Sequence, residues 1–281
     1  MIKYRDIEWA LYHQVLIPEV PPHRTVNISV EEARSLQRDS RAYFVRWTSN
    51  WDCGRETEFW YVIKDGSSSL EELSGNTRSK VRRGLKHCKV KKVDAQYLAA
   101  NAYGVYAKAF ERYEDYKRPV EKAVFQRQMS ELEYGKAWEF WGVWNRDDEL
   151  IAYSQNRIQE SVCNYATVKF DPQHLRLYPS YALFFEMNKH YLNDRNVDYV
   201  NDGARALSHD TKIQSFLIQK FKFRKSFCIL HVVYRADIKF LVDILFPIRR
   251  VFYNTKFSFA AKLAVLLRHE EIRRSPLNNL T

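Results

Sequence analysis

The sequence predicts an α/β (α+β) fold in which helices flank a mixed, mostly antiparallel central sheet. Residues 139–158 alternate apolar and polar side chains on both sides of Arg146–Asp148, which is typical of a β-hairpin. Residues 162–170 follow directly and are rich in the β-branched and aromatic residues that strands favour. Residues 197–235 then have the pattern of a strand, a helix and a strand. Strands that alternate with helices indicate an α/β sheet.

Composition narrows the class of protein and of partner. The 281 residues are 46% hydrophobic and 15% aromatic, which is typical of a globular protein with a sizeable core. The net charge of +11 favours an anionic partner: nucleic acid, membrane headgroups or a phosphorylated ligand. Four cysteines lack CxxC spacing, so neither a metal site nor a disulfide framework is expected. With no signal peptide and no membrane-length apolar run, we expect a cytoplasmic protein.

The first 65 residues form a predicted β-rich segment. Residues 42–47 and 58–64 are aromatic and β-branched, and the turn residues Asn50, Asp52 and Gly54 lie between them. The pattern predicts a supporting hairpin or small subdomain, without a catalytic motif.

A basic helix is predicted next. Ser69 and Glu72 have capping-box spacing, and an apolar stripe runs from Leu70 to Cys88. Residues 78–92 contain eight Lys or Arg and no acidic residue. Such a face is either solvated or held against an anion, because like charges a helical turn apart repel. We expect three of its arginines to contribute to phosphate or substrate recognition: Arg78, Arg82 and Arg83.

Residues 93–132 predict two helices separated by a break at residues 113–119, with Pro119 opening the second. The break is dense in polar and aromatic residues, and it is either a substrate-lining loop or a solvated turn. Glu114 and Tyr116 are the candidate substrate-binding residues there.

A helix is predicted from Pro179 to Leu192, because Pro suits a first helical position and apolar residues follow at helical spacing. It begins shortly after the strand at residues 162–170. A helix N-terminus presents unpaired N–H groups, so it is a candidate anion site. Further along, Ser208 is a predicted N-cap for the helix between the last two strands.

The order of elements from residue 70 to 235 resembles the GNAT acyltransferase superfamily, in its FemAB-like or BioF2-like branch. Two pieces carry the likeness: the basic stretch TRSKVRRGLKH at Thr77–His87, and Tyr199–Lys225, where a strand ends in Asn-Asp-Gly before a helix and a Phe-Lys-Phe strand entry.

The resemblance implies that the strand at Cys163–Lys169 splays from its neighbour and pairs with the pantetheine arm of an acyl-CoA, acetyl-CoA being the first expectation, with no metal. It implies that a loop at Arg176–Ala182 holds the pyrophosphate. Pro179 and Tyr181 stand where the family has small residues, and Pro179 removes a donor. FemAB relatives use aminoacyl-tRNA, so tRNA is the alternative donor. The expected donor-binding residues are Ala166, Thr167, Val168, Arg176, Pro179, Ser180 and Tyr181.

The implied chemistry is direct transfer, in which a base takes a proton as an amine or hydroxyl attacks the donor carbonyl. Asp202, at a strand end, is the first candidate base, and Asn201 is a candidate for orienting substrate. Tyr165 and His209 are weaker candidates for proton transfer. The alternatives are that Asp202 makes a turn, Tyr165 lies in the core and His209 accompanies a helix cap.

Residues 236–281 lie outside the family pattern, so the predicted division is 1–65, 66–235 and 236–281. Pro247 is expected to break this basic, amphipathic tail into helices. The tail packs either on the main domain or a second copy of the chain, or on the inner face of a membrane. Two functions remain open: an acyltransferase acting on a small-molecule, sugar or cell-envelope acceptor, and a non-catalytic binder of RNA or another polyanion.

Overall fold

The structure is a computed structural model that describes all residues except 1, 113–117, 133–136, 208–211, 254–257 and 279–281. Contacts divide the chain into two compact units. The first unit combines both ends of the chain, residues 1–61, 204–211 and 225–281. The second unit contains residues 62–203 and 212–224. The terminal segments, which the sequence suggested as separate regions, therefore share one unit.

The first unit has a sheet of strand order β1-β2-β3-β4-β11. Its strands are β1 (Ile2–Tyr4), β2 (Ile7–Tyr12), β3 (Val15–Pro18), β4 (Phe44–Ser49) and β11 (Arg224–Tyr234). The predicted hairpin of residues 42–64 is wrong, because β4 pairs antiparallel with β11. Helix α1 (Val30–Ser40) also interrupts the segment predicted to be mostly strands. Its start has a capping box between Ser29 and Glu32, and Leu36 is buried.

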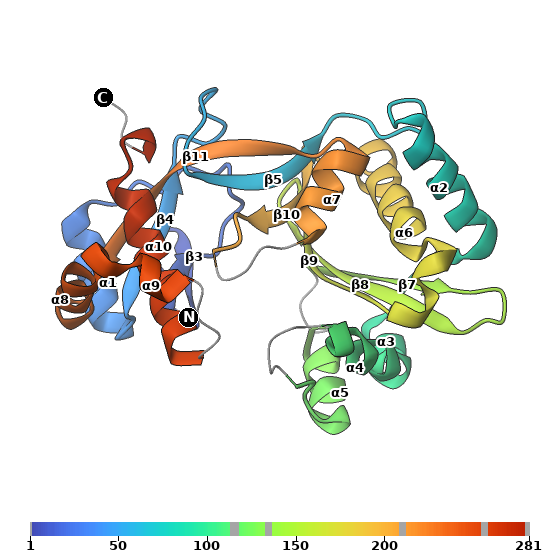
Figure 1. Ribbon diagram of the computed structural model, residues 1–281, viewed down its shortest axis with the longest axis horizontal. Helices are drawn as coiled ribbons and strands as arrows, with labels where there is room; N and C mark the ends of the chain where they lie inside the picture. Colours follow the sequence, from blue (N-terminus) through green and yellow to red (C-terminus); the bar gives the residue numbers. More distant parts are fainter. Residues whose placement is uncertain (1, 113–117, 133–136, 208–211, 254–257, 279–281) are drawn as a thin grey trace. The chain divides into compact units, whose positions relative to one another are not determined.

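The C-terminal helices complete the first unit (Figure 1). They are α8 (Ala236–Leu245), α9 (Arg250–Tyr253) and α10 (Ser258–Arg274), and Pro247 lies in the 3₁₀ turn Phe246–Ile248, as expected of a helix breaker. Ile272 of α10 packs in a buried cluster with Phe44 and Phe59. Asn278 connects the segment after α10 to β11, since its side chain forms hydrogen bonds with both the N–H and the C=O of Leu230. Among the described residues, no helix is long and apolar enough to cross a bilayer.

The second unit has strand order β5-β10-β9-β8-β7-β6. The strands are β5 (Phe59–Asp65), which begins in the first unit, β10 (Tyr199–Ala204), β9 (Val162–Phe170), β8 (Leu150–Gln159), β7 (Trp138–Trp144) and β6 (Lys89–Val93). The predicted hairpin is confirmed as β7 and β8, whose turn contains Asp148 at φ 56°. β9 is antiparallel to β8 but parallel to β10.

Helices cover both faces of strands β7 and β8 in this unit (Figure 1). On one face lie α2 (Gly75–His87) and α6 (Pro179–Asn188), with a π-helical turn continuing α6 through Lys189–Asp194. On the other face lie α3 (Ala95–Asn101), α4 (Tyr103–Ala109) and α5 (Lys122–Glu131). Helix α7 (Lys212–Phe221) precedes β11.

Three predicted helix boundaries need correction. Helix α2 begins after an N-cap at Ser74 and not at Ser69. The Glu72 carboxylate accepts from the Ser69 N–H as predicted, but it also binds the Lys64 ammonium, so these residues form a loop contact before the helix. The basic stretch is not one helix, since α2 ends at His87 and residues 89–93 form β6. The described part of residues 93–132 forms three α-helices instead of the two predicted, and α5 begins at Lys122 after Glu121.

Candidate active site

The centre of the second unit's sheet contains two parallel strands that part. β10 pairs with β9 at three positions, from Tyr199 opposite Val162 to Asn201 opposite Asn164. β9 then continues to Phe170, and its residues beyond Asn164 have no β10 partner within the described part of the chain. The backbone groups on this edge of β9 are therefore available to a ligand.

A β-bulge lies on β9 where the strands part. Gln155 of β8 pairs with Thr167 and the next residue, Asn156, pairs with Tyr165, so Ala166 is the extra residue. Ala166 is exposed, and Thr167 and Val168 are half-buried. Bulges bend a strand and turn its N–H and C=O groups away from the ladder, and they are frequent beside active sites. The three strand residues expected at the donor therefore lie on one open edge.

Asn201 holds the point where β9 and β10 separate. Its side-chain N–H donates to Asn164 Oδ1 at 2.8 Å, and its Oδ1 accepts from the Gly203 N–H at 2.9 Å. Gly203 has φ 97°, a conformation that favours glycine. Asn201 is buried, and these contacts occupy both ends of its amide. Asn201 therefore positions the segment of β10 that carries Asp202.

Asp202 is half-buried, and loss of solvation raises the pKa of its carboxyl group to about 7. No described residue forms a hydrogen bond or an ion pair with the Asp202 carboxyl group. Tyr165 is buried, donates to Asn188 Oδ1 at 2.8 Å and packs against Phe184. Burial first, and nearby groups that include Asp202, raise the pKa of Tyr165 well above its ordinary value. Tyr165 is thus both a core residue and a neighbour of Asp202, whereas His209 lies outside the described residues.

The N-terminus of α6 has few free donors. Tyr178, at φ 60°, precedes Pro179, which has no N–H. The N–H groups of Tyr181 and Ala182 both donate to the Tyr178 carbonyl, at 3.1 and 3.2 Å. Ser180 therefore has the one N–H of this turn without an acceptor among the described residues. Arg176 is exposed in the preceding 3₁₀ turn, Pro172–Leu177.

Helix α2 packs closely on this turn. A Cβ on Gly84 would lie 2.7 Å from the Tyr178 carbonyl oxygen and 3.2 Å from Ala182 Cβ, so only glycine permits the approach. The residue before Gly84, Arg83, stacks over the Tyr178 ring at 4.8 Å and donates to its hydroxyl at 3.3 Å. Lys80 lies 5.6 Å from the Tyr181 ring centroid. Two cations of α2 are therefore held beside the N-terminus of α6.

The other predicted substrate residues lie elsewhere. Arg82 is exposed on α2, and Arg78 donates to the Leu73 carbonyl oxygen at 3.1 Å. Glu114 and Tyr116 lie outside the described residues.

Comparisons with known proteins bear on the fold. No family model matches the sequence, and no curated protein matches it. Among solved structures, FemX superposes with a TM-score of 0.57 at 11% identity, covering 77% of each chain. The chain has a FemX-like fold. The C-terminal domain of a putative lysylphosphatidylglycerol synthetase from Agrobacterium fabrum matches with a TM-score of 0.50 at 12% identity, covering 85% of this chain and 83% of that one. The expected FemAB-like fold is confirmed.

A buried polar network that the sequence did not reveal joins strands β7 and β8 to the helix that follows β9. The Tyr191 hydroxyl, on the π-helical turn after α6, accepts from Trp141 Nε1 at 2.9 Å and Asn156 Nδ2 at 3.2 Å, and donates to Glu139 at 3.0 Å. Burial acts to raise the pKa of Glu139, but Lys92, Tyr191 and Arg195 hold it below its ordinary value. The sequence predicts only a helix with apolar residues at helical spacing for residues 179–192, which include Tyr191. Its spacing gave no sign of polar partners on two different strands.

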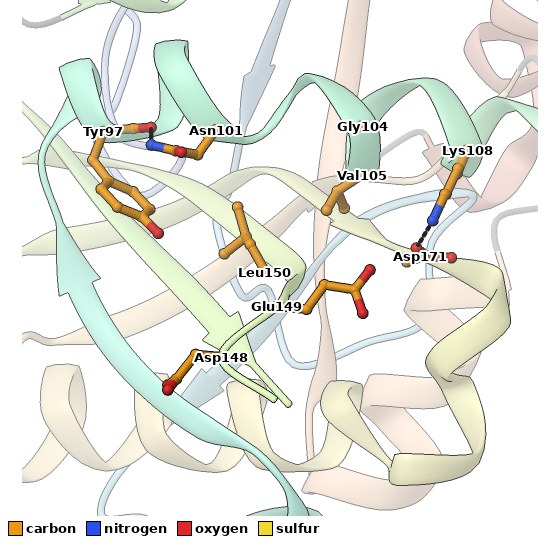
Figure 2. Close-up of a pocket in the computed structure, with 9 residues that line it drawn as sticks. All are labelled: Tyr97, Asn101, Gly104, Val105, Lys108, Asp148, Glu149, Leu150 and Asp171. Atoms are coloured by element: carbon orange, nitrogen blue, oxygen red, sulfur yellow. Dashed lines mark hydrogen bonds and ion pairs between the residues drawn. The ribbon is translucent and has the colours of Figure 1, made fainter. Parts of the chain in front are cut away.

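A separate pocket of about 290 Å³ lies on the α3–α4 side of the FemX-like sheet (Figure 2). At one end Lys108 forms an ion pair with the buried Asp171 at 2.7 Å. His174 Nε2 lies 3.4 Å from Glu149 and 4.0 Å from Asp171, so the three could in principle surround a cation. The Lys108 ammonium already neutralises Asp171, which also caps the following turn through the Gln173 N–H. This cluster therefore anchors the loop after β9.

Proposed function

We propose that the protein is a transferase that passes an acyl or aminoacyl group directly to an amine or hydroxyl acceptor. The observation that carries the proposal is the position of Asp202, at the point where β9 and β10 part. Its carboxyl group has a pKa near 7 and no protein partner among the described residues. A carboxyl group with a pKa near the working pH is suited to general base catalysis. The FemX-like fold supports this assignment by analogy.

In the proposed reaction, the donor carbonyl lies along the open edge of β9, near the bulge at Ala166. Backbone N–H groups of the bulge polarise the carbonyl oxygen. The acceptor nitrogen or oxygen attacks the carbonyl carbon while Asp202 takes its proton. The C–S or C–O bond to the donor then breaks, and the proton is returned to the leaving group. Asn201 acts by holding the segment of β10 that carries Asp202.

Two donors fit this site, an acyl-CoA such as acetyl-CoA and an aminoacyl-tRNA. One observation favours the second. A compact diphosphate site needs several free N–H groups at a helix N-terminus, whereas the α6 turn offers Ser180 alone, and Pro179 and Tyr181 are buried. Arg83 and Lys80 beside that turn supply positive charge without that geometry, which suits a longer polyanion.

Titration calorimetry with acetyl-CoA, longer acyl-CoAs and charged tRNA tests the donor. Binding of a CoA thioester that Arg176→Ala weakens supports acyl-CoA, and tight binding of charged tRNA alone supports the aminoacyl donor. The transferase assignment itself is tested by turnover with the donor that binds. Binding of both charged and uncharged tRNA without transfer to any amine or hydroxyl would instead indicate a non-catalytic polyanion binder.

A further inference from the structure

An arginine lies in the core region of the first unit. Arg46 is on β4 with Phe44 and Thr48, and alternate strand residues share one face. Phe44 on that face belongs to a buried cluster with Phe59 and Ile272 of α10. The Arg46 guanidinium lies 5.8 Å from the Phe59 ring centroid, and Arg46 is half-buried. A positive charge has therefore been placed against an apolar cluster.

His269 of α10 holds this guanidinium in place. The His269 ring is 3% exposed, its Nδ1 lies 2.8 Å from the Val265 carbonyl oxygen, and its Nε2 lies 3.1 Å from Arg46 Nη1. Burial, with the Arg46 charge second, lowers the pKa of His269 to about 3, so the ring is neutral. The neutral tautomer that satisfies both contacts carries its proton on Nδ1, donates to Val265 and accepts from Arg46. His269 therefore orients Arg46 without neutralising it.

No carboxylate among the described residues pairs with Arg46. The adjacent acid on α10, Glu270, is occupied by Arg273 and Arg274, at 2.7 Å each. By contrast, the buried Lys64 ammonium of β5 forms an ion pair with the Glu72 carboxylate at 2.8 Å. A cation removed from water without a counter-charge is costly, and burial accordingly lowers the pKa of Arg46.

We infer that Arg46 is the centre of a binding site for a small oxyanion, a carboxylate or a phosphate group. A guanidinium has five N–H donors in a planar fork, and His269 accepts from one Nη. The remaining donors match the paired oxygens of an oxyanion, and partial exposure gives the ligand access. The bound anion supplies the missing counter-charge. This site uses residues of the first unit only, so it is independent of the proposed chemistry at Asp202.

The alternative is that Arg46 serves the fold alone, and the two cases differ in a measurable way. Replacing a half-buried charge that has no counter-charge by an apolar side chain of similar length is commonly neutral or stabilising, whereas removing a structural contact destabilises. A ligand-binding residue thus lowers stability in the absence of its ligand. Arg46→Met keeps the aliphatic volume and removes the charge, so it separates the two cases.

Thermal unfolding of the full chain with increasing phosphate or acetate, at constant ionic strength set with chloride, tests the inference. For the wild type we expect a saturable rise in Tm with at least one anion, and a larger rise with phosphate or with acetate identifies the preferred oxyanion. Arg46→Met should lose this rise and, without anion, unfold at an equal or higher Tm. Arg34→Met, which removes an exposed arginine on α1, is the matched control and should keep the full rise.

His269→Gln should retain part of the anion response, since it keeps a neutral acceptor but loses the ring's fixed orientation. A wild-type Tm indifferent to both anions would overturn the inference. So would an Arg46→Met variant that keeps the same anion-dependent rise, or one that unfolds at a much lower Tm without anion. Because Asp202 is not involved, these outcomes are independent of whether the protein proves to be a transferase.

Discussion

Asp202 shows how one residue's surroundings decide its chemistry. An aspartate in water is ionised far below neutral pH, whereas loss of solvation raises the pKa of Asp202 to about 7. Because a general base must be deprotonated, we expect the rate constant for transfer to rise with pH and level off above about pH 7. Asp202→Asn should lower that rate by roughly 10²-fold or more. A variant with wild-type turnover and an unchanged pH profile would show that another group, or water, is the base.

The same pKa predicts how stability depends on pH. Between the ordinary aspartate pKa and about 7, the folded state binds the Asp202 proton more tightly than the unfolded state does. The contribution of Asp202 to the free energy of unfolding is therefore present at low pH and lost as pH rises through about 7. Asp202→Asn removes this dependence, so its Tm at pH 8 should equal or exceed that of the wild type. A large loss of Tm at pH 8 would show that the Asp202 carboxylate serves the fold of β10 instead.

At the level of elements, local patterns were predictable and distant pairings were not. The β7–β8 hairpin follows from alternation on both sides of one short turn, so neighbouring residues contain the whole signal. The pairing of β4 with β11 joins residues 44–49 to residues 229–234, and nothing in either strand specifies the other. Likewise, Ser69 and Glu72 had the spacing of a capping box, but the Glu72 carboxylate binds Lys64, which lies on β5. The candidate site shows the same limit, because the sequence indicated Asp202 but gave no sign of the three-residue pairing that exposes β9.

The contact between α2 and α6 gives a matched pair of glycine substitutions. Gly84→Ala would place its Cβ 2.7 Å from a backbone oxygen, so α2 must shift, at a cost of about 1–3 kcal/mol in the free energy of unfolding. Gly75→Ala, in the first turn of the same helix, meets nothing within 4 Å and should be neutral or stabilising by up to about 1 kcal/mol. Urea unfolding measures both. Equal effects of the two changes would mean that α2 does not pack as closely as the structure shows.

The charges of α2 predict a salt-dependent interaction with the donor. Arg82 and Arg83 are exposed on one helix, and Arg83 lies at the α6 turn. Reversing both to Glu should weaken donor binding by at least tenfold, and wild-type affinity should fall as salt rises. Arg34→Glu with Arg38→Glu on α1 makes the same change in net charge at exposed positions and is the control. Donor affinity that is insensitive to salt and to the α2 reversal would leave α2 as a solvated surface. So would an equal loss from both double variants.

The path of the whole chain was the least predictable feature. The sequence suggested three successive regions, whereas contacts join residues 1–61, 204–211 and 225–281 in one unit, and residues 62–203 and 212–224 in another. Only long-range packing reveals that both ends of the chain belong to one unit. Apolar residues such as Phe59 and Ile272 do not indicate from the sequence that they pack in the same cluster. The charge of the whole chain, in contrast, is fully given by its composition.

That charge leads to a prediction about a membrane surface, which we propose from helices α8 and α9. Four large apolar side chains on these helices and the 3₁₀ turn between them are more than half exposed: Phe240 (69%), Ile244 (55%), Ile248 (53%) and Val251 (74%). Their spacing places them on one face of the nearly continuous helical path from α8 to α9, and a face of this kind marks an interaction surface. A second copy of the chain would bring another net charge of +11, whereas an anionic bilayer attracts it. Residues 236–281 add to that attraction, with eight Lys or Arg against four Asp or Glu.

We therefore expect the protein to co-sediment with vesicles that contain phosphatidylglycerol, and much less with vesicles of phosphatidylcholine alone. Phe240→Ser with Val251→Ser should reduce this binding several-fold, since each removes apolar surface that would leave water in the bilayer interface. Val30→Ser, at an exposed apolar position on α1, is the control and should bind as the wild type does. A dimer in light scattering that the double variant abolishes, without vesicle binding, would assign the α8–α9 face to a second copy of the chain. Equal sedimentation with both kinds of vesicle would exclude an electrostatic contribution to membrane binding. If the cations of the protein approach the headgroups, the protein must bind anionic vesicles more strongly than neutral ones.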